Sequence, residues 1–116
     1  MDIAYVVTAV LLSVVLIGSG TAKLRRVPQV VEGLGKANVP DSWFPPLALV
    51  EFAGAAGLLI GIGVRPLGLA AAVGVVLYFV GAVGAHLRAG DRAGVGTPAG
   101  VLVLAVATLV FAALTV

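Results

Sequence analysis

Residues 3–22 read IAYVVTAVLLSVVLIGSGTA and contain no charged side chain. Twenty residues of α-helix rise about 30 Å, which matches the hydrocarbon thickness of a bilayer. Three further apolar stretches follow at residues 45–62, 66–87 and 98–115. Among the Asp, Glu, Lys and Arg residues of the chain, only Glu51 interrupts one of these stretches. The pattern predicts four helices that cross a membrane.

The composition of the whole chain also favours a fold embedded in lipid. Of its 116 residues, 61% are hydrophobic and only 10% are charged, whereas about 25% are charged in a typical soluble domain. A chain of this length is expected to form one domain. We therefore expect an all-α membrane protein in which residues 1–116 form a single four-transmembrane-helix bundle.

The connection between the first two spans carries its own helical pattern. Apolar side chains recur there every three or four residues, with polar residues between them, at Val27, Val30, Val31 and Leu34. This spacing predicts a short amphipathic helix that lies in the membrane interface.

Basic residues are distributed unevenly between the two sides of the predicted bundle. The loops after the first and third spans share one side and hold Lys23, Arg25, Arg26, Lys36, Arg88 and Arg92, whereas the other side holds Arg65 alone. The positive-inside rule then places both loops in the cytoplasm and both termini on the other side of the membrane. Basic residues kept for a binding site would produce the same bias. The formal net charge of +2 is too small to indicate nucleic-acid binding.

Three ionisable residues fall in one leaflet because neighbouring spans run antiparallel. Lys23 ends the first span, Glu51 lies early in the second, and His86 lies near the end of the third. Ionisable groups inside a membrane are commonly functional. The three are therefore candidate catalytic residues for proton transfer. The alternatives are a structural carboxylate tied to another helix, a snorkelling lysine and an interfacial histidine.

Four other residues are candidates for contact with a lipophilic ligand. Tyr78 and Phe79 precede His86 by about two helical turns, Trp43 marks the re-entry of the chain into the membrane, and Ser19 lies in the small-residue end of the first span. Each is equally compatible with ordinary packing or anchoring.

Several kinds of site are not predicted. The chain has no cysteine, which excludes disulfides, thiolate metal ligands and a dithiol redox couple. No spacing of His and acidic residues predicts a metal site. The segment GSGTAK at residues 18–23 lacks the spacing of a phosphate-binding loop. No cofactor site of the chain's own is evident.

Small residues are frequent within the predicted spans, because the chain has 16 glycines. Such residues allow helices in lipid to approach closely. We expect them mainly to pack the four helices against one another, and association with a second copy of the chain is the alternative.

Three segments in order carry a family resemblance: GSGTAKL at 18–24, PLALVEFAGAAGLLIGIG at 46–63 and GAVGAHLR at 81–88. With them, the chain resembles the DoxX-like family of small four-span bacterial membrane proteins. That family takes its name from a membrane subunit of a thiosulfate:quinone oxidoreductase. The resemblance implies a membrane redox system, with a quinone as a ligand and a redox protein as a partner.

Three functions follow as hypotheses. The first is a subunit, or a quinone- or lipophile-binding element, of a membrane redox system. The second is a membrane-embedded acid–base enzyme of the isomerase, epoxide-opening or cyclase type, which acts on a lipophilic small molecule through Glu51, His86 and Lys23. The third is a small proton-coupled multidrug transporter, although the essential acid of such exporters lies in the first span, where this chain has none.

Overall fold

A computed structural model describes residues 3–115, apart from the side chains of residues 41, 93 and 115. This part of the chain consists of helices joined by turns and short connections and contains no strand. Its four long helices are α1 (Ile3–Leu24), α3 (Phe44–Ile60), α4 (Arg65–Arg88) and α5 (Gly96–Thr115). A shorter helix, α2 (Pro28–Lys36), and two 3₁₀ turns, η1 (Asp41–Trp43) and η2 (Ala93–Val95), lie in the connections. Each long helix begins and ends within about two residues of a predicted span, within the usual uncertainty of helix ends.

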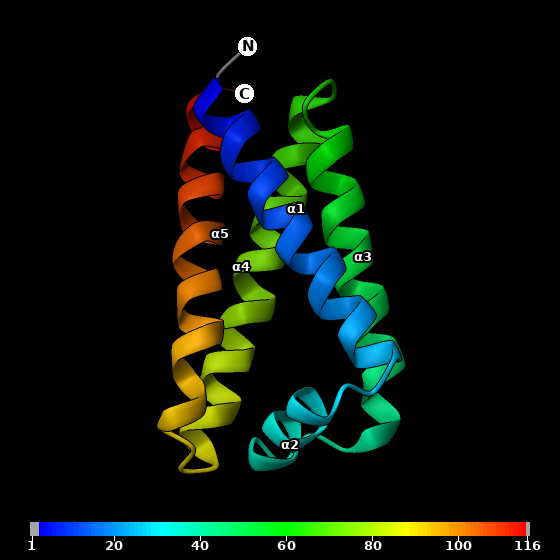
Figure 1. Cartoon of the computed structure of the whole chain (residues 1–116). Helices are drawn as coiled ribbons and strands as arrows, with labels where there is room; N and C mark the ends of the chain where they lie inside the picture. Colours follow the sequence, from blue (N-terminus) through cyan, green and yellow to red (C-terminus); the bar gives the residue numbers. More distant parts are fainter. Residues whose placement is uncertain (1–2, 116) are drawn as a thin grey trace.

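The long helices form an antiparallel bundle (Figure 1). α1 and α4 each pack against both α3 and α5, so the four helices form a ring in the order α1, α3, α4, α5. Both termini and the α3–α4 turn lie at one end, and the two longer connections lie at the other (Figure 1). The predicted separation of the loops into two sides is therefore present in the fold.

Three of the helices are long and apolar enough to cross a membrane: α1 with 22 residues, α4 with 24 and residues 96–114 of α5 with 19. α3 is as apolar but has only 17 residues. The outward surfaces of the bundle are also apolar, with Ile3, Val103 and Leu114 each more than 70% exposed. A helix that is apolar on its exposed as well as its buried side is typical of a membrane protein.

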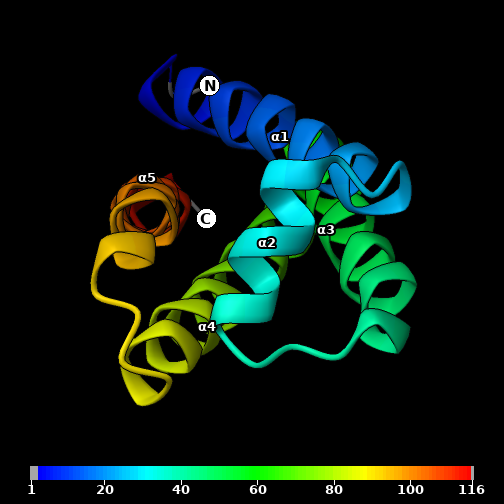
Figure 2. The same ribbon diagram turned by 60° about the horizontal axis from the view of Figure 1, so that its bottom comes forward.

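α2 lies across the end of the bundle that carries the two longer connections (Figure 2). Its Val30, Val31 and Leu34 side chains are partly buried, whereas Gln29 and Glu32 are exposed. Proline in the first turn starts α2, α3 and α4, where its missing N–H leaves no hydrogen bond unmade. The connection between α1 and α3 thus contains a short helix with one partly buried apolar side and one exposed polar side.

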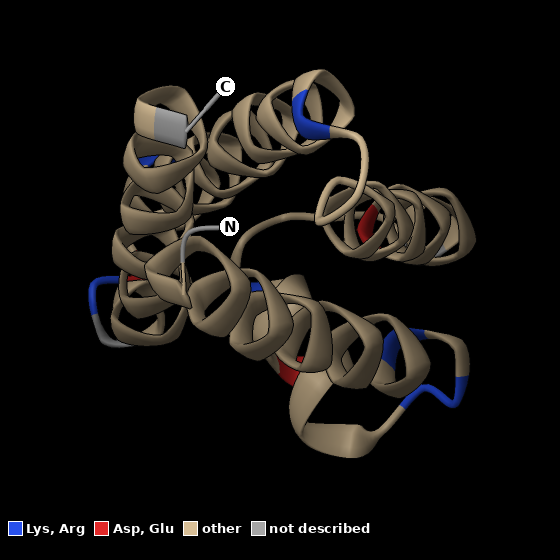
Figure 3. Cartoon of the chain, turned by 90° about the horizontal axis from the view of Figure 1, so that it is seen from above, with Lys and Arg blue, Asp and Glu red and all other residues tan. Residues whose placement is uncertain are grey.

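Charged residues are sparse and gather at the helix ends and connections (Figure 3). The α1–α3 and α4–α5 connections lie at the same end of the bundle (Figure 1), and six of the seven basic residues lie in them or in the adjoining last turns of α1 and α4. Arg65 lies at the opposite end, at the start of α4, with its guanidinium 4.5 Å from the ring centroid of Tyr5.

Glycines allow α3 and α4 to approach closely beside their shared turn. A Cβ atom added to Gly61 would collide with the Gly68 backbone, and one added to Gly57 would lie 2.8 Å from the Ala71 side chain. The hydroxyl of Tyr5 from α1 packs on Gly68 and donates a hydrogen bond of 3.0 Å to the Leu58 carbonyl. Small residues therefore pack this end of the bundle internally, as predicted.

Gly68→Ala is expected to destabilise the bundle by about 1–3 kcal/mol, because the added methyl group overpacks the contact with Tyr5 and Gly61. Gly84→Ala on the same helix is the control, since a Cβ atom there meets nothing within 4 Å. That substitution should leave stability unchanged or raise it by up to about 1 kcal/mol. Unfolding in mixed micelles measures both changes, and equal stability of the two variants would contradict the close contact.

Candidate functional site

A buried ion pair joins α1 to α3. The Lys23 ammonium lies 3.1 Å from Oε2 and 3.3 Å from Oε1 of Glu51. Ser19 bridges the two groups, because its Oγ accepts a 2.8 Å hydrogen bond from Lys23 and donates a 2.9 Å hydrogen bond to Oε1 of Glu51. The side chains of Lys23 and Glu51 are only 9% and 0% exposed.

The local sequence explains how the pair is assembled. Ser19 and Lys23 are four residues apart on α1, so both side chains face α3. Between them, a Cβ atom added to Gly20 would lie 2.7 Å from the Phe52 ring. Gly20 therefore leaves room on α1 for the ring of Phe52, the residue that follows Glu51 on α3.

A groove with a volume of about 350 Å³ runs between α3 and α4 and reaches the ion pair. Its walls are small and apolar along most of their length, and they are formed by Leu16, Val50, Ala53, Gly54, Gly57, Leu67, Ala70, Ala71, Gly74, Val75 and Phe79. Its only polar lining side chains among the described residues are those of Glu51 and Tyr78.

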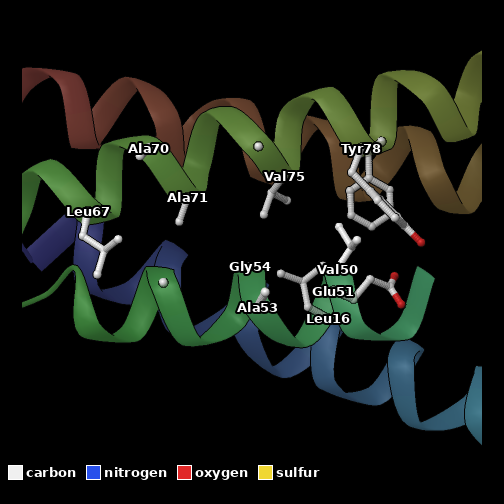
Figure 4. Close-up of a pocket in the computed structure, with 13 residues that line it drawn as sticks. Leu16, Val50, Glu51, Ala53, Gly54, Leu67, Ala70, Ala71, Val75 and Tyr78 are labelled. Carbon is white, nitrogen blue, oxygen red and sulfur yellow. The ribbon is translucent and has the colours of Figure 1, made fainter. Parts of the chain in front are cut away.

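Tyr78 supplies the polar wall that faces Glu51. In the close-up, its hydroxyl points towards the Glu51 carboxylate (Figure 4), and the two groups interact as donor and acceptor. The Tyr78 ring is held edge-to-face against Phe79, with ring centroids 5.0 Å apart. The groove thus has one polar end and one long apolar part.

His86 belongs to a separate cluster. Its Nδ1 atom lies 2.8 Å from Oδ2 of Asp91, and Oδ1 of Asp91 accepts a 3.1 Å hydrogen bond from the Gly94 N–H group. The Asp91 N–H group in turn donates a 2.8 Å hydrogen bond to the His86 carbonyl. His86 does not line the groove. The structure therefore brings Lys23 and Glu51 together and gives His86 a different partner.

The His86–Asp91 contact depends on the backbone after α4. Gly90 adopts a φ of +76°, a left-handed conformation that glycine adopts without steric cost and that turns the chain back towards His86. The hydrogen bond from His86 lowers the pKa of Asp91 below its ordinary value, with smaller contributions from the Gly94 N–H group and the charges of His86 and Lys36. The Asp91 side chain is only 11% exposed, although the residue lies in the connection between α4 and α5.

The other predicted ligand contacts have different positions. Phe79 and Tyr78 line the groove, whereas Ser19 reaches it only through its bonds to Glu51 and Lys23. Trp43 is 55% exposed and does not line the groove. Within the described residues, no three His, Asp or Glu side chains are placed to hold a metal ion.

Comparison with known families identifies the chain. A sequence profile of the DoxX-like family matches residues 7–108, which include Ser19, Lys23, Glu51, Tyr78 and His86. The chain belongs to the DoxX-like family. No curated protein and no solved structure matches it. Membership in the DoxX-like family, together with the apolar helices, indicates an integral membrane protein.

In this DoxX-like protein, Lys23→Met is expected to destabilise the fold by about 3–5 kcal/mol, because it leaves the buried Glu51 carboxylate without its counter-ion. Adding Glu51→Gln to Lys23→Met should restore most of the loss. The control is Lys36→Met, which removes an exposed pair with Glu32 and should cost at most about 1 kcal/mol. Unfolding in mixed micelles measures the cycle, and additive losses for the two buried substitutions would contradict the pairing.

The Asp91 carboxylate should stabilise the fold in a pH-dependent way. Its native pKa is lowered, so its contribution is present above the unfolded-state pKa of about 3.9 and is lost as the pH falls through the native pKa. We expect the difference in unfolding midpoint between the unsubstituted protein and Asp91→Asn to be present at about pH 5 and to shrink in more acidic solution. A difference that stays constant into strong acid would contradict the depressed pKa.

Proposed function

We propose that this chain is a four-span protein of the bacterial inner membrane that binds a lipophilic molecule between α3 and α4. It would act as the quinone- or lipophile-binding element of a membrane redox system. The observation that carries this proposal is the groove itself, which is apolar along its length and ends at Tyr78 and the Lys23–Glu51 pair. Ligand pockets commonly combine apolar walls with a few placed polar groups.

The packing of α3 supports its assignment as the fourth span. Its 17 residues rise about 25 Å, at the short limit for a helix that crosses a bilayer. It packs against α1 on one side and α4 on the other. The Lys23 ammonium also compensates the charge of Glu51, which reduces the cost of placing a carboxylate in this helix.

The ends of the bundle support an orientation. The six basic residues in and beside the α1–α3 and α4–α5 connections favour a cytoplasmic location for that end. α2 lies across this end with its polar residues exposed (Figure 2), as an interfacial helix would. Both termini would then lie outside.

A redox role is supported by the family to which the chain belongs. The chain has no cysteine, so any electron transfer would need a group other than a thiol of its own. A quinone held in the groove, or a partner protein docked to the bundle, would then carry the electrons. Glu51 and Tyr78, which line the polar end of the groove, would lie beside the head group of the quinone or of its reduced quinol form, with Lys23 as the counter-ion of Glu51.

Gly74→Leu tests the groove as a binding site. Gly74 lines the groove, and a Cβ atom there meets nothing within 4 Å, so the larger side chain should enter the groove without displacing protein atoms. Protein purified from its native membrane should then retain at most about one-tenth of the quinone or other lipophile bound by the unsubstituted protein, because a loss of about 1.4 kcal/mol weakens binding tenfold.

Gly81→Leu is the matched control for this experiment. Gly81 lies two helical turns further along α4, does not line the groove and is also open around its Cβ position. This variant should retain the bound molecule, and unchanged helicity would show that both variants are folded. Equal retention by Gly74→Leu and Gly81→Leu would contradict the proposed function.

A further inference from the structure

The hydrogen bonds around Glu51 have a single direction. Lys23 donates to both carboxylate oxygens, and Ser19 donates to one of them. An ammonium group has donors only, so the carboxylate is the acceptor in each of these contacts, as expected of its ionised form. Lys23 and Glu51 together are neutral, so the polar end of the groove carries no net charge.

The direction of these bonds determines what Tyr78 can offer to a ligand. A phenolic hydroxyl has one proton to donate and lone pairs with which to accept. Because an ionised carboxylate can only accept, the interaction between Tyr78 and Glu51 uses the phenolic proton. The Tyr78 oxygen is then left as a hydrogen-bond acceptor beside the groove (Figure 4).

The length of the groove favours a chain as its apolar occupant. The lining residues on α4 extend from Leu67 to Phe79, about 18 Å at 1.5 Å per residue. A groove of about 350 Å³ that extends over this length can hold one extended hydrocarbon chain along its apolar walls.

We propose that the groove selects a neutral, single-chain lipid whose head group donates a hydroxyl proton to Tyr78. Prenylated quinols, long-chain phenols and long-chain alcohols share this chemistry. A carbonyl oxygen is itself an acceptor and has no proton to donate to the Tyr78 oxygen. A charged head group would lie beside the neutral Lys23–Glu51 pair without a counter-ion. This inference rests on the proposed function, because it names the class of molecule that occupies the same groove.

The experiment uses the full-length protein in lipid nanodiscs and two radiolabelled probes with identical ten-carbon tails. One probe is a benzoquinol, and the other is its dimethyl ether, which lacks the hydroxyl protons. We expect the quinol to bind about fivefold more tightly, equivalent to about 1 kcal/mol and typical of one hydrogen bond. Tyr78→Phe should reduce this ratio to about one while leaving the affinity for the ether unchanged.

Decanol identifies the source of the selectivity. If decanol competes with the quinol in a Tyr78-dependent way, recognition rests on the hydroxyl alone and long-chain alcohols are ligands. If decanol does not displace the labelled quinol and unlabelled quinol does, the quinol ring also contributes to binding. The loss of the quinol-to-ether affinity ratio in Tyr78→Phe then supports the hydroxyl preference.

The possible failures can be distinguished. Equal binding of quinol and ether that Gly74→Leu abolishes would overturn the hydroxyl preference and leave the proposed binding function standing. A quinol preference that survives Tyr78→Phe would also overturn it. Binding of neither probe above the level of empty nanodiscs would contradict the proposed function itself.

Discussion

The ion pair between Lys23 and Glu51 is the interaction on which this part of the bundle depends. A lone carboxylate among apolar helices costs several kcal/mol unless it is paired, and here the Lys23 ammonium and the hydroxyls of Ser19 and Tyr78 satisfy it. The pair links α1 to α3. It also leaves a neutral, polar point at the end of an otherwise apolar groove, where the proposed ligand would place its head group.

The size of the residues on α3 and α4 determines where the groove forms. Near their shared turn, Gly61 and Gly68 bring the two backbones into contact. Further along, the two helices diverge towards the end that carries α2 (Figure 1). Gly74 and Ala70 fill little of the space between them. Small residues therefore allow the α3 and α4 backbones to touch near their shared turn, and they leave a groove between the two helices further along.

Apolar runs predict the helices, and antiparallel order predicts that Lys23 and Glu51 lie in one leaflet. Their direct contact was left open as one alternative. The bridging role of Ser19 was not predicted, although its spacing of four residues from Lys23 places both on one face of a helix. The partner of His86 was not predicted, because Asp91 reaches it only through the left-handed turn at Gly90. An equal depth in the membrane indicates which ionisable groups could come into contact. The conformation of the loop after α4 determines that His86 contacts Asp91.

Methyl-resolved NMR of the protein in nanodiscs with the ten-carbon benzoquinol tests the binding groove most directly. If the groove is the site, nuclear Overhauser contacts will connect the ligand chain to the methyl groups of Ala53, Ala70 and Ala71, and the head group to the Tyr78 ring. Val103 on the exposed face of α5 will show no such contacts above those of bulk lipid. Equal contacts at Val103 and at the three alanines would contradict specific binding between α3 and α4.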